Sequence, residues 1–158
     1  MTWIGLSFKT KNMEQNQHMR PSSAFIGASW AALLVGIIAF IIGLWNAEMQ
    51  LNEKGYYFTV LLFGLYSGIS VQKAIRDQLE GIPVTNLYYG ISWFAALSAI
   101  VLLTIGLWNA ELTKSEKGFY AMSFVLSMYA AIAVQKNTRD VQLSEKHEEK
   151  QTTETRIL

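Results

Sequence analysis

Four long stretches without a charged residue constrain this chain more than any other feature. They cover residues 24–47, 55–72, 81–110 and 118–135. A helix needs about 20 apolar residues to cross a ~30 Å hydrocarbon core, and flanking lysines that extend outward let a slightly shorter helix span. A soluble protein of 158 residues with four such stretches would lack the polar surface to cover them. The sequence therefore predicts an all-α membrane protein with transmembrane helices near 24–45, 56–73, 87–108 and 119–136.

Composition narrows the classes of function. The net charge of +1 argues against nucleic-acid binding driven by bulk charge. The absence of cysteine excludes disulfides, thiolate metal sites and cysteine nucleophiles. The middle of each predicted span carries no ionisable residue of the kind that marks a proton or ion path. Glycine-rich phosphate loops and the common hydrolase motifs are also missing. We expect no enzyme activity, no catalytic residue, no metal and no cofactor.

The chain contains an internal duplication. A shift that places Ser29 on Ser92 aligns residues 29–77 with 92–140 without a gap, and nearly half of the aligned positions are identical. Each copy holds two spans, so both copies enter the membrane in the same direction. The sequence therefore predicts two helical hairpins related as parallel repeats. The expected organisation is an N-terminal tail (1–23), a first repeat (24–77), a linker (78–86), a second repeat (87–140) and a charged, solvated or disordered tail (141–158).

The distribution of lysine and arginine predicts the orientation. The two tails and the linker region together hold ten of these residues, whereas the two loops inside the hairpins hold three. Cytoplasmic segments of membrane proteins are enriched in lysine and arginine. We expect both termini and the linker to be cytoplasmic and the hairpin loops to face outward.

Two motifs recur in both copies. GLWNAE(M/L)xxxEKG(Y/F)Y occupies residues 43–57 and 106–120, and VQKxxRD occupies 71–77 and 134–140. On these residues the chain resembles the YiaA/YiaB inner-membrane protein family, whose unit is a two-helix domain, over about residues 24–140. The resemblance implies a multi-pass protein of the bacterial inner membrane with no assigned biochemical activity.

The first motif lies where a span meets the membrane interface. Tryptophan is favoured at headgroup level, asparagine can end a helix, and a glutamate near a helix start favours its dipole. We interpret the motif as an interface anchor with helix caps. In the alternative, its carboxylates from both loops converge on a cation or a basic partner. The candidate residues are Trp45, Asn46, Glu48, Glu53, Lys54, Gly55, Trp108, Asn109, Glu111, Glu116, Lys117 and Gly118.

The second motif ends the second span of each copy. Lys73 and Asp77 are four residues apart and can pair, and cations there favour both the helix C-terminus and an anionic leaflet. In the alternative, the four cations of the two copies form a pocket for an anionic lipid headgroup. The glutamines are candidates for hydrogen bonds to a neighbouring helix. The candidate residues are Gln72, Lys73, Arg76, Asp77, Gln135, Lys136, Arg139 and Asp140.

Small residues four apart predict close helix packing. Gly64 and Gly68 are the best candidates for a homo-oligomer face, although packing within the bundle explains them as well. The lipid bilayer is the expected partner, and the sequence identifies no protein partner. We expect a structural or accessory envelope protein. The alternative is a small transporter or channel formed by an oligomer, whose uncharged polar stripe would include Ser67, Ser123 and Ser127.

Overall fold

A computed structural model describes residues 20–157 of the chain. In this part every regular element is an α-helix: α2 (Ser23–Asn46), α3 (Leu51–Leu79), α4 (Asn86–Asn109) and α5 (Lys114–Ile157). All four are long and apolar enough to cross a membrane. The structure therefore confirms an all-α membrane protein with four transmembrane helices. The predicted tail 1–23 lies mostly outside the described residues.

The helices begin at caps that the two repeats share. The hydroxyls of Ser22 and Thr85, which occupy matched positions, accept hydrogen bonds from the amides of Phe25 and Tyr88. These bonds satisfy amides that have no partner inside the helix. After α3 the chain turns at Gly81, whose φ of 73° suits glycine. α2 and α4 match the predicted spans closely, whereas α3 and α5 extend beyond theirs at both ends.

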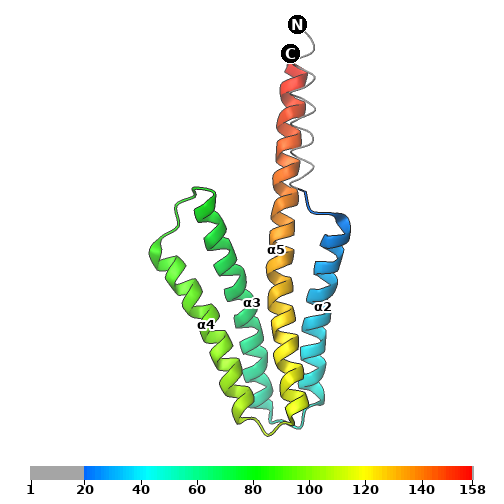
Figure 1. Cartoon of the computed structure of the whole chain (residues 1–158), viewed down its shortest axis with the longest axis vertical. Helices are drawn as coiled ribbons and strands as arrows, with labels where there is room; N and C mark the ends of the chain where they lie inside the picture. Colours follow the sequence, from blue (N-terminus) through cyan, green and yellow to red (C-terminus); the bar gives the residue numbers. More distant parts are fainter. Residues whose placement is uncertain (1–19, 158) are drawn as a thin grey trace.

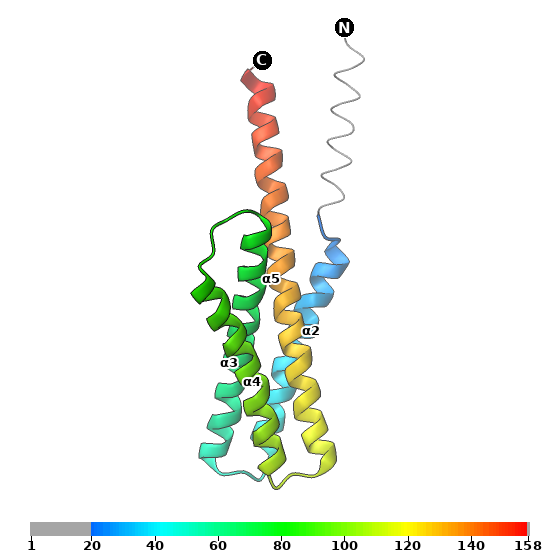
Figure 2. The ribbon, with the colours of Figure 1, turned by 60° about the vertical axis from the view of Figure 1, so that its left-hand side comes forward.

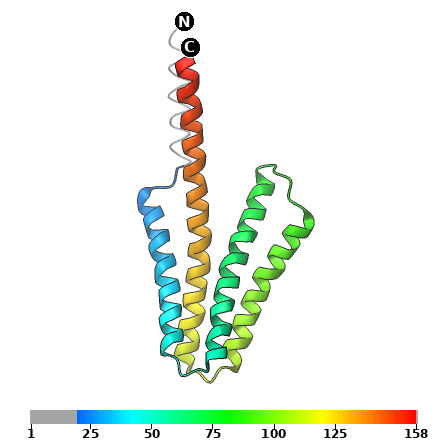
Figure 3. The same cartoon turned by 180° about the vertical axis from the view of Figure 1, so that it is seen from behind.

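The helices stand in the order α4, α3, α5, α2, so that α3 and α5 are central (Figure 1). The view from behind shows the same order reversed (Figure 3). Residues 47–50 and 110–113 connect helices at one end, called here the loop end. Residues 80–85 connect α3 to α4 at the opposite end, called here the linker end. Helices α2 and α4 run in the same direction, as parallel repeats require.

The helices pair across the repeats. α2 packs most extensively against α5, α4 packs against α3, and α3 packs against α5 in the centre. The two helices of one repeat touch each other much less. A pseudo-two-fold axis between α3 and α5 relates the two halves, because it exchanges α2 with α4 and α3 with α5. The duplicated hairpins are present as predicted, but each hairpin packs mainly on the other one.

The apolar core lies in the half of the molecule nearer the loop end. It contains Phe40, Leu44, Tyr57, Val60, Leu61, Ala99, Leu103, Leu107, Tyr120 and Phe124. Large apolar side chains also cover the outward faces of α2 and α4, where Leu34, Ile38, Phe94 and Leu97 are more than half exposed. In a membrane these outward side chains face lipid.

Beyond the linker end, α5 continues as a projecting helix (Figure 2). The sequence predicted a solvated or disordered segment over 141–158. The structure describes it as helix as far as Ile157, and most of the described side chains are exposed.

Candidate functional site

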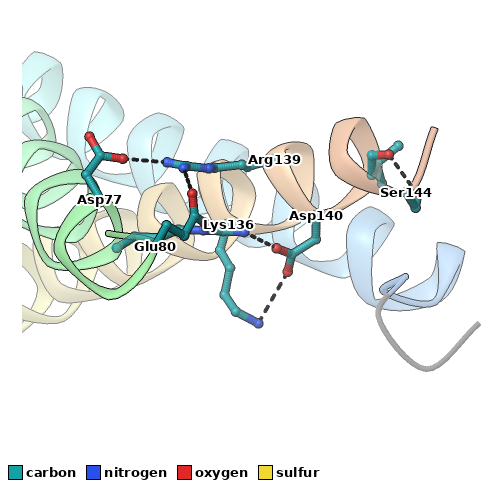
Figure 4. A network of polar contacts seen from close by, with 8 residues as sticks. Asp77, Glu80, Lys136, Arg139, Asp140 and Ser144 are labelled. Carbon is teal, nitrogen blue, oxygen red and sulfur yellow. Dashed lines mark hydrogen bonds and ion pairs between the residues drawn. The ribbon is translucent and has the colours of Figure 1, made fainter. Parts of the chain in front are cut away.

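Ionic side chains from α3 and α5 meet at the linker end of the molecule. Figure 4 shows this group, which we call the ion-pair cluster. It consists of Arg76, Asp77, Glu80, Lys136, Arg139 and Asp140. Three residues come from each repeat or its end, and the positive and negative charges are equal in number. The cluster therefore joins the two central helices without adding net charge.

The two arginines of the second motif pair with the aspartates of the opposite repeat. Arg76 Nη2 lies 2.6 Å from Asp140 Oδ1, and Arg139 Nη1 lies 2.9 Å from Asp77 Oδ1. The side chains of Arg76 and Asp140 are each only 16% exposed. Charge-assisted bonds of this kind are stronger than neutral ones, and partial burial reduces screening by salt. The motif therefore acts as a reciprocal clasp between repeats.

Glu80 adds a third carboxylate that sequence reasoning missed. Arg76 Nε lies 2.9 Å from Glu80 Oε1, and Arg139 Nη2 contacts Glu80 Oε2. The hydrogen bond from Arg76, followed by the charge of Arg139, holds the pKa of Glu80 below its ordinary value of 4.5, against a partial opposing effect of desolvation. The second repeat has Leu143 at the matched position. The four-residue spacing between Arg76 and Glu80 is the sequence signal that could have identified this residue.

The lysines of the second motif are more exposed than its arginines. Lys73 is exposed, and Lys136, which is 60% exposed, approaches Asp140 at 3.6 Å. The sequence allowed Lys73 to pair with Asp77, but Asp77 pairs with Arg139 of the other repeat instead. Among the charged residues of this motif, Lys73 and Lys136 are therefore the most accessible from outside the protein.

A buried asparagine makes the polar contact that was expected of the glutamines. Asn137 is 1% exposed, and its Nδ2 donates to Ser29 Oγ on α2 at 3.0 Å. Gln72 is half-buried, and the buried Oε1 of Gln135 has no hydrogen-bond partner, as is also true of Asn137 Oδ1. Alignment of the repeats offered no signal for Asn137, because the first repeat has Ala74 at the matched position.

At the loop end, both glutamates of the EKG triplets cap helices. Glu53 Oε2 accepts from the Gln50 amide at 2.8 Å, and Glu116 Oε2 accepts from the Thr113 amide at 2.8 Å. A second bond runs in the opposite direction, because Thr113 Oγ1 accepts from the Glu116 amide. These capping boxes start α3 and α5 earlier than hydropathy predicts.

The lysines and asparagines of the first motif close the preceding helices. Lys54 Nζ donates to the Trp45 carbonyl at 3.1 Å, and Lys117 Nζ donates to the Trp108 carbonyl at 3.3 Å. The amides of Asn46 and Asn109 donate to carbonyls four residues earlier. Each bond satisfies a carbonyl at a helix C-terminus. The lysines therefore act as hydrogen-bond donors to backbone carbonyls at the ends of the preceding helices.

The remaining residues of the first motif are open to the surroundings. Trp45 and Trp108 are 83% and 82% exposed, Glu48 and Glu111 are exposed, and a Cβ added at Gly55 or Gly118 would touch nothing. Among the described residues, no three His, Asp or Glu side chains gather as metal ligands. The geometry therefore shows helix capping by this motif, while interface anchoring by its tryptophans stays a prediction.

The tyrosines that follow each capping box close the loop end, which sequence reasoning missed. The sequence interpretation of the whole first motif as an interface anchor includes Tyr57 and Tyr120, yet their side chains are only 3% and 2% exposed. Their rings stack across the pseudo-two-fold axis with centroids 6.0 Å apart. Tyr120 also meets Phe40 edge to face at 5.3 Å. The aromatic stack and the ion-pair cluster hold the central helices at opposite ends.

Comparison with known proteins identifies the family. The family described as the yiaA/B two helix domain matches residues 25–77 and again residues 88–140. The chain belongs to the YiaA/YiaB family. Each match coincides with one repeat, so the cross-repeat clasp joins two complete YiaA/YiaB domains. No solved structure matches the chain.

The chain is similar to three known proteins. It is 53% identical over 133 residues to the inner membrane protein YiaA of Escherichia coli (strain K12), covering 84% of this chain and 92% of that protein. It is 30% identical over 99 residues to the inner membrane protein YiaB of the same strain, covering 61% of this chain and 81% of YiaB. It is 37% identical over 67 residues to the uncharacterized membrane protein YubF of Bacillus subtilis (strain 168), covering 42% of this chain and 77% of YubF.

Proposed function

We propose that this protein is a structural or accessory component of the bacterial inner membrane, built as a static four-helix scaffold. The observation that carries the proposal is the fastening of α3 to α5 at both ends. The Tyr57–Tyr120 stack joins them near the loops, and the Arg76–Asp140 pair and its reciprocal join them near the linker. A helix pair fixed at both ends resists the opening that alternating access requires.

The polar residues of the central helices support a scaffold over a transporter. Ser67, Ser123 and Ser127 are buried between helices. The hydroxyls of Ser67 and Ser127 donate to carbonyls of their own helices at 3.1 and 2.7 Å. A buried hydroxyl that already donates to its own helix has no free hydrogen for a solute, whereas a pore needs polar groups that face water.

The proposed orientation places both termini and residues 80–85 in the cytoplasm. The excess of lysine and arginine at the linker end supports it. In this orientation the ion-pair cluster and the projecting part of α5 face the cytoplasm, and the capped loops face the periplasm.

In the same orientation, Lys73 and Lys136 contact anionic headgroups of the inner leaflet. Both are exposed at the linker end, while the neighbouring arginines are held by carboxylates. A lysine near an anionic surface contributes about 1 kcal/mol of attraction. Native mass spectrometry with phosphatidylglycerol should show fewer bound lipids for Lys73→Gln/Lys136→Gln. Lys114→Gln at the loop end is the control, and equal losses for both would contradict the assignment.

A flux assay tests the scaffold against the transporter. The purified chain is reconstituted in vesicles, and proton and potassium leakage is followed with entrapped dyes. We expect the rates of protein-free vesicles. Saturable flux that Ser67→Ala or Ser127→Ala reduces would overturn the scaffold and favour a transport path through the central helices.

A further inference from the structure

The contacts between the two repeats have the form of a two-fold symmetric dimer. In such an interface, if residue i of one protomer contacts j of the other, then j of the first contacts i of the second. Arg76 pairs with Asp140, and their matched residues in the opposite repeats, Arg139 and Asp77, pair with each other. The clasp is therefore a reciprocal contact between two identical motifs.

The loop end follows the same rule. A Cβ at Gly43 would lie 2.9 Å from Phe119 and 3.1 Å from Tyr120. A Cβ at the matched Gly106 would lie 2.7 Å from Tyr56 and 3.1 Å from Tyr57. The glycine of each GLWNAE sequence thus packs against the two aromatic residues that follow EKG in the opposite repeat. The central Tyr57–Tyr120 stack joins two matched residues across the axis.

A single repeat lacks most of this packing. Its two helices touch each other little, and its buried tyrosine and its aspartate have their partners in the other repeat. YubF is a relative that is much shorter than this chain, because the 67 matched residues are 77% of its length. A chain of that size is too short for both matched segments, which extend here from residue 25 to residue 140.

We propose that each two-helix repeat is a protomer and that its face toward the other repeat is a docking surface. The partner that fits this surface is a second two-helix chain with the same features. These are the glycine of the GLWNAE sequence, the two aromatic residues after EKG, and the arginine and aspartate of VQKxxRD. In this protein the partner is the second repeat, which the linker 80–85 joins to the first repeat in one polypeptide. The linker is not needed to hold the assembly together, because the contacts named above lie elsewhere.

Differences between the repeats select which pair forms. A Cβ at Gly36 would lie 2.5 Å from Ser127 Oγ and 2.9 Å from the Ser127 amide nitrogen. The second repeat has Ala99 at the position matched to Gly36. Two second repeats would therefore set an alanine against Ser127 on both sides of the axis. The surface of a second repeat accordingly prefers a first repeat to another copy of itself.

Cleavage of the folded, full-length chain tests this proposal. A protease site is inserted at the exposed Ile82, with different affinity tags at the two ends, and the purified protein is cut in mild detergent. We expect the halves to co-elute as one complex. Separation of the halves on cutting would overturn the proposal.

Charge variants of the same cleavable protein show whether the interface is the reciprocal one. Arg76→Glu/Arg139→Glu places like charges in both pairs, and the cut halves should dissociate faster. The control Arg139→Asp/Asp77→Arg/Glu80→Gln exchanges the partners of one pair and removes the carboxylate that Arg139 also contacts, so it should keep the halves together. Equal dissociation of the two variants would overturn the assignment of the docking surface.

Exchange between molecules tests the choice of partner. Two cut preparations with different tags are mixed in detergent until their halves redistribute. Mixed complexes should contain one first repeat and one second repeat. Recovery of second-repeat pairs in equal amount would contradict the selection by Gly36 and Ser127. The proposal shares the α3–α5 contacts with the proposed function, but the cleavage and exchange outcomes do not depend on solute transport, which the flux assay measures separately.

Discussion

Substitution of Gly36 by alanine tests the close packing of α2 on α5. The added methyl group would lie 2.9 Å from the main-chain nitrogen of Ser127, and that atom cannot move without shifting α5. Ser127 is itself fully buried, and its hydroxyl is engaged at 2.7 Å with the Ser123 carbonyl. The added carbon therefore has no space that a side-chain rotation could open.

The expected cost follows from two opposing effects. Overpacking of a tight core costs about 1–3 kcal/mol. Replacing a glycine within a helix by alanine returns roughly 0.5–1 kcal/mol. We expect Gly36→Ala to lower the free energy of unfolding by up to about 2.5 kcal/mol, with the midpoint of the range near 1 kcal/mol. Unfolding is measured by titration with a denaturing detergent and followed by circular dichroism.

Gly27→Ala is the matched control on the same helix, because a Cβ there would touch nothing. It should be neutral or slightly stabilising. Gly36→Ala/Ser127→Gly reproduces the alanine and glycine that the other half carries as Ala99 and Gly64. This double variant should recover part of the loss. Equal stability of Gly36→Ala and Gly27→Ala would show that α2 and α5 are not tightly packed at this contact.

Three further predictions concern the clasp and the orientation. A double-mutant cycle on Arg139→Ala and Asp77→Ala should give a coupling energy of about 0.5–3 kcal/mol in detergent unfolding, and a value near zero would deny the pair a stabilising role. The lowered pKa of Glu80 means that its contribution is present above pH 4.5 and is lost as pH falls through its folded pKa. The melting-temperature difference between wild type and Glu80→Gln should therefore be largest near neutral pH and shrink in acid; a constant difference would contradict this. Reporter fusions after residues 50 and 114 should be periplasmic and those at 80 and the C-terminus cytoplasmic, and a periplasmic C-terminus would overturn the orientation.

Hydropathy and self-comparison were enough to predict the four spans and the duplication, because lipid imposes length and apolarity on each helix separately. The sequence did not predict which helices pack against each other. The sequence could show Lys73 four residues before Asp77 on one helix, but it could not show that Arg139 would lie nearer in space. The second motif was therefore located correctly, while its main partners were found only in the structure.

Two further features escaped the sequence for identifiable reasons. Tyr57 and Tyr120 lie near the interface in the chain, where aromatic residues usually serve as anchors. They are buried because the opposite repeat offers Gly106 and Gly43 for them to pack on. The face of Gly64, a candidate for contact with a second copy, is covered by Phe124 within one chain. Packing within the bundle, one of the two uses that the sequence allowed for Gly64, therefore accounts for this position, and an oligomer contact stays a prediction.

Intramolecular crosslinking tests the pairing of helices across the repeats most directly. The chain has no cysteine, so introduced pairs report without background. Ser29 and Asn137 touch at 3.0 Å between α2 and α5, whereas Ser92, matched to Ser29, lies on α4 in the same repeat as Asn137. In native membranes, Ser29→Cys/Asn137→Cys should form a crosslink within one chain, and Ser92→Cys/Asn137→Cys should not. The reverse result would show that each hairpin packs on itself and would contradict the pairing across repeats.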